Sequence, residues 1–330
     1  MGRSMRRRTF IGAIGLGLMP GRVAAQQGVR VRRIGFLSPV ASQPAPLPPV
    51  EALREGLRAE GFVEGRNLAV EWRFAEWKLE RLPELAADLV RLKVEVIVAA
   101  LEPAIIAARQ ATTSIPIVMA TSADAVADGL VASLGKPGGN VTGMTAMSSE
   151  LSAKRLELLR EMAPTLARVA VLWNASNAAK ERDWQDTQKA AATLRLAVHP
   201  AEARPGAELE AAFGAIRSAR ADGLVVLHDA LTWSHRDRII DFSARERLPA
   251  VYEATEWAGA GGLLAYGVTH ADLFRGSASY VAKILRGARP AELPVQQPAR
   301  IPLVVNVRTA RALSLKVPPS LLARAELVGE

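Results

Sequence analysis

Any chemistry in this chain must come from oxygen and nitrogen side chains, because its 330 residues include no Cys. Disulfides, iron–sulfur clusters, Cys-ligated zinc and a thiol nucleophile are therefore excluded. The group richest in possible metal ligands is His228-Asp229 with His235 and Asp237. No two of the four His have the helical spacing of paired metal ligands. A polar loop at a strand end explains this group better than a metal site, and we expect no metal and no cofactor.

Motifs for catalysis are scarce in the rest of the chain. The Gly-rich stretch 135–140 lacks the Gly-Lys-Ser/Thr ending of a phosphate-binding loop, and no Gly-x-Ser-x-Gly nucleophile elbow occurs. Acid pairs such as Asp124 with Asp128, or Glu253 with Glu256, have the side chains for general acid–base catalysis. Acids in loops and at helix starts are common without such a role, so the sequence favours a binding protein over an enzyme.

Short apolar runs of β type alternate with longer segments of helical periodicity along most of the chain. This alternation is typical of strand–helix–strand units around a parallel sheet. One series covers 34–120, and a second, similar series covers 151–266 after the turn-rich stretch 135–140. Because a single core stops growing near this chain length, we predict an α/β fold with two doubly wound parallel-sheet lobes.

The sequence after the second series predicts a hinge in which the chain crosses between the lobes three times. After Gly267 the pattern gives a helix over 271–285, a Pro-rich segment and a further strand over 303–306. We expect that the chain passes between the lobes three times. The predicted organisation is an export signal at 1–25, lobe 1 at 26–142 plus 268–292, and lobe 2 at 143–267 plus 293–330.

The first 25 residues have the composition of a cleavable export signal. Arg6-Arg7-Arg8 precedes an apolar run over 10–19, and small residues follow up to Ala25. The run is much shorter than the ~20 residues of a membrane-spanning helix. Arg7-Arg8-Thr9-Phe10-Ile11 resembles the twin-arginine export motif, and an ordinary export signal is the alternative. We expect cleavage near Ala25 and a periplasmic protein.

The formal net charge of +9 does not indicate a nucleic-acid partner. Five of the 42 basic residues and none of the 33 acidic residues lie within 1–25, so the remainder is close to neutral. No long basic run follows Arg33, whereas nucleic-acid-binding proteins concentrate basic residues on one face or helix. We therefore expect no nucleic-acid partner.

Short polar residues follow the predicted strands at their carboxyl ends. Open α/β sheets bind ligands there, close to the N–H groups at helix N-termini. For each residue taken singly, helix capping is the more common role. Both lobes present such loops, however, and a cleft between the lobes can enclose a solute. The candidate ligand-binding residues are Ser38, Glu102, Thr121, Ser122, Asp124, Asn174, Asn177, Asp229, Tyr252 and Glu253.

Nine segments carry a resemblance to a known family. They include Gly-Phe-Val-Glu-Gly-Arg-Asn-Leu at 61–68 and Gly-Lys-Pro-Gly-Gly-Asn-Val-Thr-Gly within 133–143, and the others lie at 33–35, 168–174, 235–237, 248–252, 261–267, 293–298 and 317–322. In this order they resemble the exported ABC-transporter substrate-binding proteins of the tryptophan/tyrosine-uptake-like group. The resemblance covers 33–328.

This resemblance implies the two-lobed type I periplasmic binding fold and a small amino-acid-like solute, aromatic or branched, bound in the inter-lobe cleft. It also implies an ABC permease in the inner membrane as the partner, and we expect a monomer. Two alternatives stay open: a periplasmic sensory receptor of the same fold, and an α/β enzyme.

The chain departs from the family pattern after the third predicted strand. Relatives usually carry a small Ser/Thr-rich turn there, whereas this chain has Leu101-Glu102 before Pro103. A Glu at a helix N-terminus competes with a ligand carboxylate for the same N–H groups. Either Glu102 points away from the cleft, or the ligand differs and brings a cationic group of its own.

Overall fold

The computed structural model describes Met1 and residues 30–42, 47–146, 151–204 and 209–330. The predicted export signal, its twin-arginine motif at Arg7-Arg8 and its cleavage site near Ala25 lie outside the described residues. The chain divides into two compact units, Met1–Arg30 and Val31–Glu330. Both sheets and their helices lie within the second unit.

The first sheet has five parallel strands in the order β2-β1-β3-β4-β5. They are β1 (Arg32–Ser38), β2 (Leu68–Phe74), β3 (Val96–Ala100), β4 (Ile117–Thr121) and β5 (Val141–Gly143). Every residue of β3 and β4 is buried, because helices cover both faces of the sheet. One face packs against α1 (Pro48–Ala59) and α10 (His270–Leu285), and the other against α2 (Leu82–Arg91) and α3 (Glu102–Ala111).

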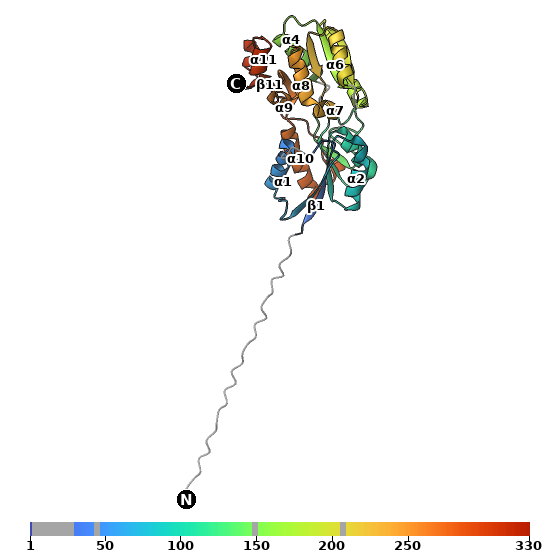
Figure 1. Ribbon diagram of the computed structural model, residues 1–330. Coiled ribbons are helices and arrows are strands. Elements are labelled where there is room, and N and C mark those ends of the chain that lie inside the picture. The colour runs from blue at the N-terminus through green and yellow to red at the C-terminus, as the bar shows by residue number, and fades with distance from the viewer. Residues whose placement is uncertain (2–29, 43–46, 147–150, 205–208) are drawn as a thin grey trace. The chain divides into compact units, whose positions relative to one another are not determined.

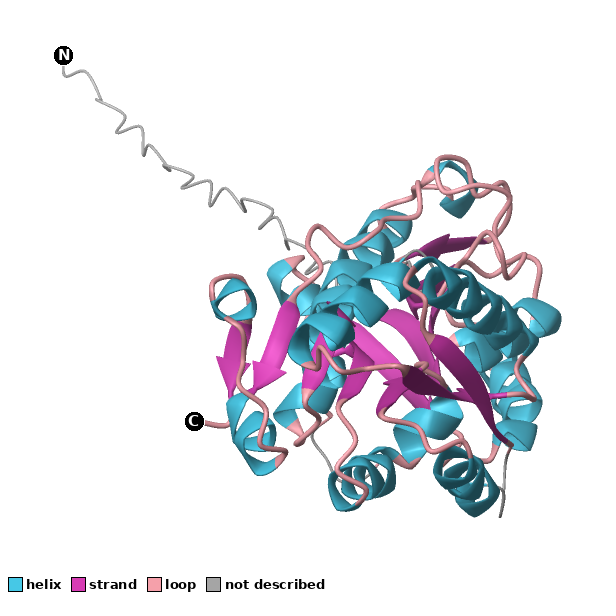
Figure 2. Cartoon of the chain, turned by 90° about the horizontal axis from the view of Figure 1, so that it is seen from above, coloured by secondary structure: helices cyan, strands magenta, loops and turns pink. Residues whose placement is uncertain are grey.

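The second sheet has seven strands in the order β12-β11-β10-β9-β8-β6-β7. Its strands are β6 (Arg168–Asn174), β7 (Ala197–Ala203), β8 (Gly223–Val226), β9 (Ala250–Ala254), β10 (Leu264–Val268), β11 (Leu303–Asn306) and β12 (Glu326–Val328). The helices around it are α4 (Ser152–Met162), α5 (Ala178–Thr193), α6 (Leu209–Ser218), α7 (Ala230–Ser234), α8 (Arg236–Arg245), α9 (Thr255–Gly259), α11 (Val307–Ala312) and α12 (Pro319–Leu322). Figure 2 shows strands with helices on both sides.

Both sheets confirm the predicted fold class of two doubly wound sheets. The second sheet repeats the strand order of the first, as β7-β6-β8-β9-β10, and adds two strands beyond β10. The first added strand, β11, runs antiparallel to β10. The second, β12, has three residues at the sheet edge, too few for a sequence pattern to identify a strand, and it runs parallel to β11.

The connection after β10 brings the chain from the second sheet to the first. Helix α10 follows β10 directly and packs alongside α1 (Figure 1). Gly56 of α1 permits this close approach, since a Cβ there would lie 2.7 Å from the Cβ of Ala278. The residues at the start of α10 therefore lie where the chain passes between the sheets.

The segment after α10 returns along the first sheet. Gln296 N donates to the carbonyl of Gly143, at 2.9 Å, and Thr145 N donates to the carbonyl of Gln296, at 3.0 Å. Val295 is buried in the same hydrophobic cluster as α2 and α3. The predicted lobe boundaries stay a prediction, and these contacts favour a last boundary after residue 296 rather than at 292.

Candidate functional site

A cavity of about 530 Å³ lies where strands of both sheets end. Ser38 ends β1 and Thr121 ends β4 on the first sheet, and His228 lies just beyond β8 on the second. This is the edge at which open α/β sheets bind ligands. The lining residues are Phe36, Ser38, Val40, Ala41, Leu47, Pro48, Pro49, Val50, Trp77, Ala100, Leu101, Thr121, His228, Trp233, Ser234, His235, Arg236, Asp237, Arg238, His270 and Phe274.

Aromatic rings form much of the cavity wall. From the first sheet and α10 come Phe36 and Phe274, whose ring centroids lie 6.2 Å apart. Helix α7, beside the second sheet, contributes Trp233, whose ring lies 5.4 Å from that of His228 and 5.3 Å from that of His270. These spacings are those of offset and edge-to-face aromatic pairs. The wall suits a flat, apolar group.

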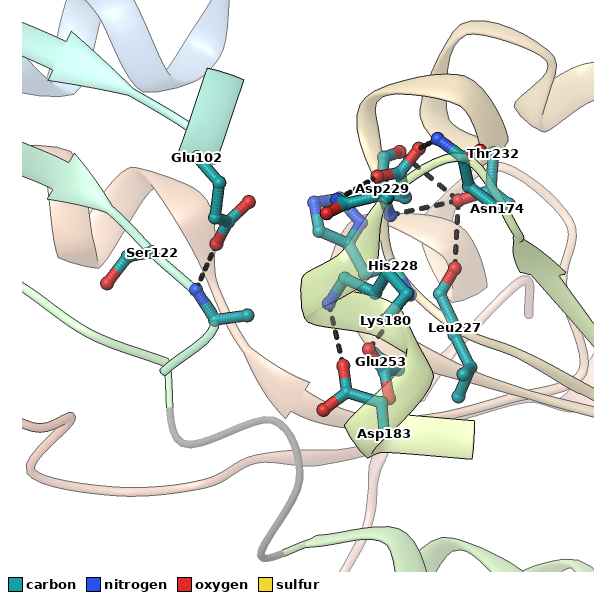
Figure 3. Close-up of polar contacts among 12 residues, drawn as sticks. Glu102, Ser122, Asn174, Lys180, Asp183, Leu227, His228, Asp229, Thr232 and Glu253 are labelled. Carbon is teal, nitrogen blue, oxygen red and sulfur yellow. Dashed lines mark hydrogen bonds and ion pairs between the residues drawn. The ribbon is translucent and has the colours of Figure 1, made fainter. Parts of the chain in front are cut away.

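Three predicted site residues position Trp233 rather than line the cavity. Asp229 caps α7, the short helix that carries Trp233, and its carboxylate accepts from Leu231 N at 2.7 Å. The side-chain amides of Asn174 and Asn177 donate to the two oxygens of Asp229, at 2.8 and 2.7 Å. Figure 3 shows the Asn174–Asp229 contact. This network fixes the start of α7 and so the direction of its tryptophan.

A narrow recess opens beside the cavity. It is lined by Glu102, Ser122 and Glu253, and it shares Thr121, His228, His270 and Leu101 with the larger cavity. Glu102 is 5% exposed, and one carboxylate oxygen accepts from the backbone N–H of Ala123. Glu102 thus lines the recess instead of facing solvent. In Figure 3 it approaches from one side, while His228 and Glu253 stand on the other.

A buried ion pair supports the recess from the second sheet. Arg155 Nη1 lies 2.7 Å from Glu253 Oε1, and each side chain is 1% exposed. Arg155 Nε also donates to the carbonyl of Tyr266, and the other oxygen of Glu253 accepts from His228 N at 2.8 Å. Burial raises the pKa of Glu253, while the guanidinium of Arg155 opposes that change. Glu253 is thereby held in one orientation and in turn holds the backbone of His228.

A second buried pair lies nearby on α5. Lys180 Nζ contacts Asp183 Oδ2 at 2.7 Å. Burial works against the Lys180 charge, but the carboxylates of Asp183, Glu253 and Glu102 outweigh it and raise the pKa of Lys180. Burial, followed by the charge of Glu102, raises the pKa of Asp128 to about 7. The buried Asp128 Oδ2 has no hydrogen-bond partner within the described part of the chain.

The remaining predicted residues have other surroundings. Asp124 caps a local turn, since its Oδ1 accepts from Val126 N and Ala127 N. Tyr252 is buried in the core of the second sheet, where its ring lies 4.7 Å from that of Trp257 and its hydroxyl lies 3.2 Å from that of Ser243. Neither residue lines the cavity or the recess. Ligand binding by Ser38, Glu102, Thr121, Ser122 and Glu253, which do line them, stays a prediction.

Sequence reasoning missed the aromatic lining. It selected short polar residues after strands, whereas the structure adds Phe36, Trp77, Trp233, Phe274 and His270. The sequence could have indicated Trp233, because this residue follows shortly after His228-Asp229 at the same strand end. No such signal existed for Phe274, because α10 is distant in sequence from α1. The described residues contain no group of three or more His, Asp or Glu that could hold a metal ion.

A family model described as ABC transporter substrate binding protein matches residues 34–328. The chain belongs to the family of ABC transporter substrate-binding proteins. This confirms the resemblance found in the sequence. Proteins of this family bind small-molecule solutes outside the cytoplasm and work with an ABC permease. In this substrate-binding protein, none of the described helices is long and apolar enough to cross a membrane.

One relative is a tyrosine-binding protein of Clostridioides difficile (strain R20291), 26% identical over 263 residues, which are 79% of this chain and 75% of the relative. A conserved domain protein of Vibrio cholerae is 27% identical, with a TM-score of 0.83. An ABC domain from Streptococcus pneumonia in complex with L-Trp is 23% identical, also with a TM-score of 0.83, and shows the shared fold. A ligand-free, open substrate-binding protein of Clostridium difficile is 25% identical, with a TM-score of 0.67. Each of these three structures covers 90% of this chain, which spans 99% of each of them.

Proposed function

We propose that this protein is the periplasmic solute-binding component of an ABC importer, and that its solute is amino-acid-like with an aromatic side chain. The observation that carries the proposal is the aromatic wall of the cavity at the strand ends. The protein would deliver its solute to a permease of the inner membrane, acting as a monomer and making or breaking no bond.

The size and polarity of the cavity support such a solute. Its volume of about 530 Å³ lies within the range of small-molecule pockets, roughly 300–1,000 Å³. Trp233 lies on α7 beside the second sheet and Phe274 on α10 against the first sheet, and both line the cavity, so an aromatic group between them would contact both. Ser38 and Thr121, at two strand ends, supply hydroxyls beside this apolar wall. Apolar walls with a few placed polar groups are typical of sites that bind amino-acid-sized ligands.

The relatives also support this solute class. One is named a tyrosine-binding protein, and one structure of the same fold contains L-Trp. Residues 1–25 would direct export, through the twin-arginine route at Arg7-Arg8, and would be removed near Ala25. The periplasmic location and the export route are thus parts of the proposal that rest on the sequence.

Isothermal titration calorimetry with L-Tyr, L-Trp and L-Phe against L-Ala and L-Glu tests the proposal. We expect binding of at least one aromatic amino acid and none of the two small or acidic ones. Trp233→Ala should weaken that binding about tenfold, since an aromatic pair contributes roughly 0.5–1.5 kcal/mol beyond area burial. Trp233→Phe keeps a ring and serves as the matched control. Equal heats of binding for all five amino acids, or no heat of binding for any of them, would reject the proposed solute class.

A further inference from the structure

Glu102 is a buried carboxylate with one oxygen left over in the recess. The residue is 5% exposed, and its Oε1 accepts from the backbone N–H of Ala123. Among the residues that the structure describes, Oε2 has no hydrogen-bond partner and the carboxylate has no ion-pair partner. In Figure 3 this second oxygen points across the recess toward His228. A buried carboxylate is costly until a cation pairs with it.

The charged side chains near the recess leave Glu102 unbalanced. Arg155 Nη1 contacts Glu253 Oε1 at 2.7 Å, and each of these two side chains is 1% exposed. Lys180 Nζ contacts Asp183 Oδ2, also at 2.7 Å. Each pair contains one charge of each sign, so both pairs are neutral. The carboxylate of Glu102 therefore leaves a net negative charge in the recess.

The two imidazoles that line the recess do not reverse this balance. Burial, the largest cause, holds the pKa of His228 well below its usual range, so this ring adds no positive charge. His270 Nδ1 lies 3.2 Å from Glu256 Oε2. If His270 is charged, it is neutralised by Glu256, and if it is uncharged, the carboxylate of Glu256 adds a negative charge. A cation in the recess meets negative surroundings in either case.

The size of the recess limits which cation it can hold. Its volume is about 10 Å³, close to the roughly 10–15 Å³ that one water molecule requires. A primary ammonium group is about as large as a water molecule, whereas each methyl group on the nitrogen enlarges it. The recess adjoins the aromatic cavity, because the same residues line both: Leu101, Thr121, His228 and His270. An ammonium group in the recess can therefore belong to a solute whose ring lies in the cavity.

The backbone directly before Glu102 is strained. Leu101 has a φ of 66° and a ψ of 154°, a combination that residues other than Gly rarely adopt. The backbone N–H of Leu101 donates to the carbonyl of Thr121 at 3.1 Å, which helps to hold this conformation. Strain of this kind is concentrated at binding sites. Here it lies at the residue that leads into α3 and so places Glu102 in the recess.

We propose that the recess binds a primary ammonium group of the solute at Glu102 Oε2, and that its size excludes methylated ammonium groups. The inference rests on the proposed function, because it names a second group that the aromatic solute must carry. The ring stays against the wall of the larger cavity while the ammonium group enters the recess. Val268, which is 5% exposed, forms part of the apolar side of the recess.

The probes are L-phenylalanine and N,N,N-trimethyl-L-phenylalanine, which share the ring, the carboxylate and the positive charge. In calorimetry, wild type should prefer L-phenylalanine by about ten- to a hundredfold, as expected for a hydrogen bond between charged groups. Glu102→Gln keeps an oxygen for Ala123 N but removes the charge, so this preference should fall about tenfold. Glu84→Gln, at an exposed position of α2, should keep it. The wild-type preference in Glu102→Gln would overturn the inference and leave the proposed function intact.

Val268→Ala tests the size limit while the carboxylate of Glu102 stays in place. The variant removes two methyl groups from the side of the recess. N-methyl-L-phenylalanine should therefore gain about tenfold in affinity relative to L-phenylalanine, as expected when a pocket gains room for one methyl group. An unchanged ratio of these two affinities would overturn the inference. If wild type binds neither phenylalanine, tyrosine nor tryptophan, the proposed function fails and the inference falls with it.

Discussion

At the scale of single residues, the walls of the recess are held by buried charges of opposite sign. Arg155 pairs with Glu253, and Lys180 pairs with Asp183, each at 2.7 Å. These charged groups pair with one another and with backbone atoms. They can therefore orient the site without binding the ligand themselves. Removing either partner would leave an unpaired charge in the interior and lower the free energy of unfolding.

Arg155→Met should destabilise the protein strongly. Removing one partner of a buried pair leaves the carboxylate of Glu253 uncompensated, which costs about 3–5 kcal/mol of the free energy of unfolding. The double variant Arg155→Met/Glu253→Gln should recover part of this loss, because no charge is then buried. Urea denaturation of both variants measures the two values. A double variant as unstable as the single one would show that Arg155 acts through packing.

Glu102→Gln tests the electrostatics of the recess. The amide keeps an oxygen that accepts from Ala123 N but removes the negative charge. Affinity for 3-phenylpropionate should rise and affinity for L-phenylalanine should fall, each by about tenfold, since hydrogen bonds to charged groups contribute roughly 1.5–3 kcal/mol. Glu84→Gln, at an exposed position of α2, is the matched control. Identical affinities in Glu102→Gln and wild type would place Glu102 outside the ligand site.

Asp128 should make the protein less stable as the pH rises. Its pKa is raised to about 7 in the folded protein, while an unfolded aspartate titrates near pH 3.9. Between about pH 4 and pH 7 the folded state therefore binds more protons, and the contribution of this group to stability falls as the pH rises. Asp128→Asn should remove that fall and be more stable than wild type at pH 8. Thermal unfolding of wild type and Asp128→Asn at pH 5 and pH 8 measures this difference. The same change of melting temperature with pH in both proteins would contradict the prediction.

At the scale of elements, the sequence predicted the strands and helices better than the site. The apolar runs of β3, β4 and β8 are short, fully buried and bounded by turns, so their length and their flanking turns identified them as strands. The polar residues after the strands fell into two groups. Asp124 and Asp229 satisfy backbone N–H groups locally, whereas Glu102 and Glu253 line the recess. Capping and ligand contact use the same residue types, so the sequence could not separate them.

Gly267 of β10 is an element-scale requirement for the site. A Cβ at this position would lie 1.7 Å from the carbonyl oxygen of Glu253, a backbone atom that cannot move without shifting β9. Gly267→Ala should lower the melting temperature and weaken ligand binding together, because Glu253 holds the backbone of His228. Gly214→Ala is the control: no atom lies within 4 Å of its new Cβ inside α6, so it should be neutral or up to about 1 kcal/mol more stable. Unchanged binding by Gly267→Ala would contradict this role.

At the scale of the whole molecule, two sheets of the same strand order each contribute one wall of the site. Gly143 pairs with Gln296, which is distant in the sequence, and the entry of α10 after β10 places a connection between the sheets next to the cavity, because His270 lines it. Long-range pairings of this kind, such as α1 with α10, carry no local signal in a sequence.

The cavity should bind an aromatic solute, and native mass spectrometry of the purified protein tests this most directly. Ala41→Trp fills the cavity from a partly exposed loop position, and Ala211→Trp adds the same bulk on an exposed face of α6. After incubation with an equimolar mixture of the twenty amino acids, wild type and Ala211→Trp should each gain one aromatic amino acid, and Ala41→Trp should gain none. Retention of the same ligand by Ala41→Trp, or of a non-aromatic one by wild type, would contradict the account.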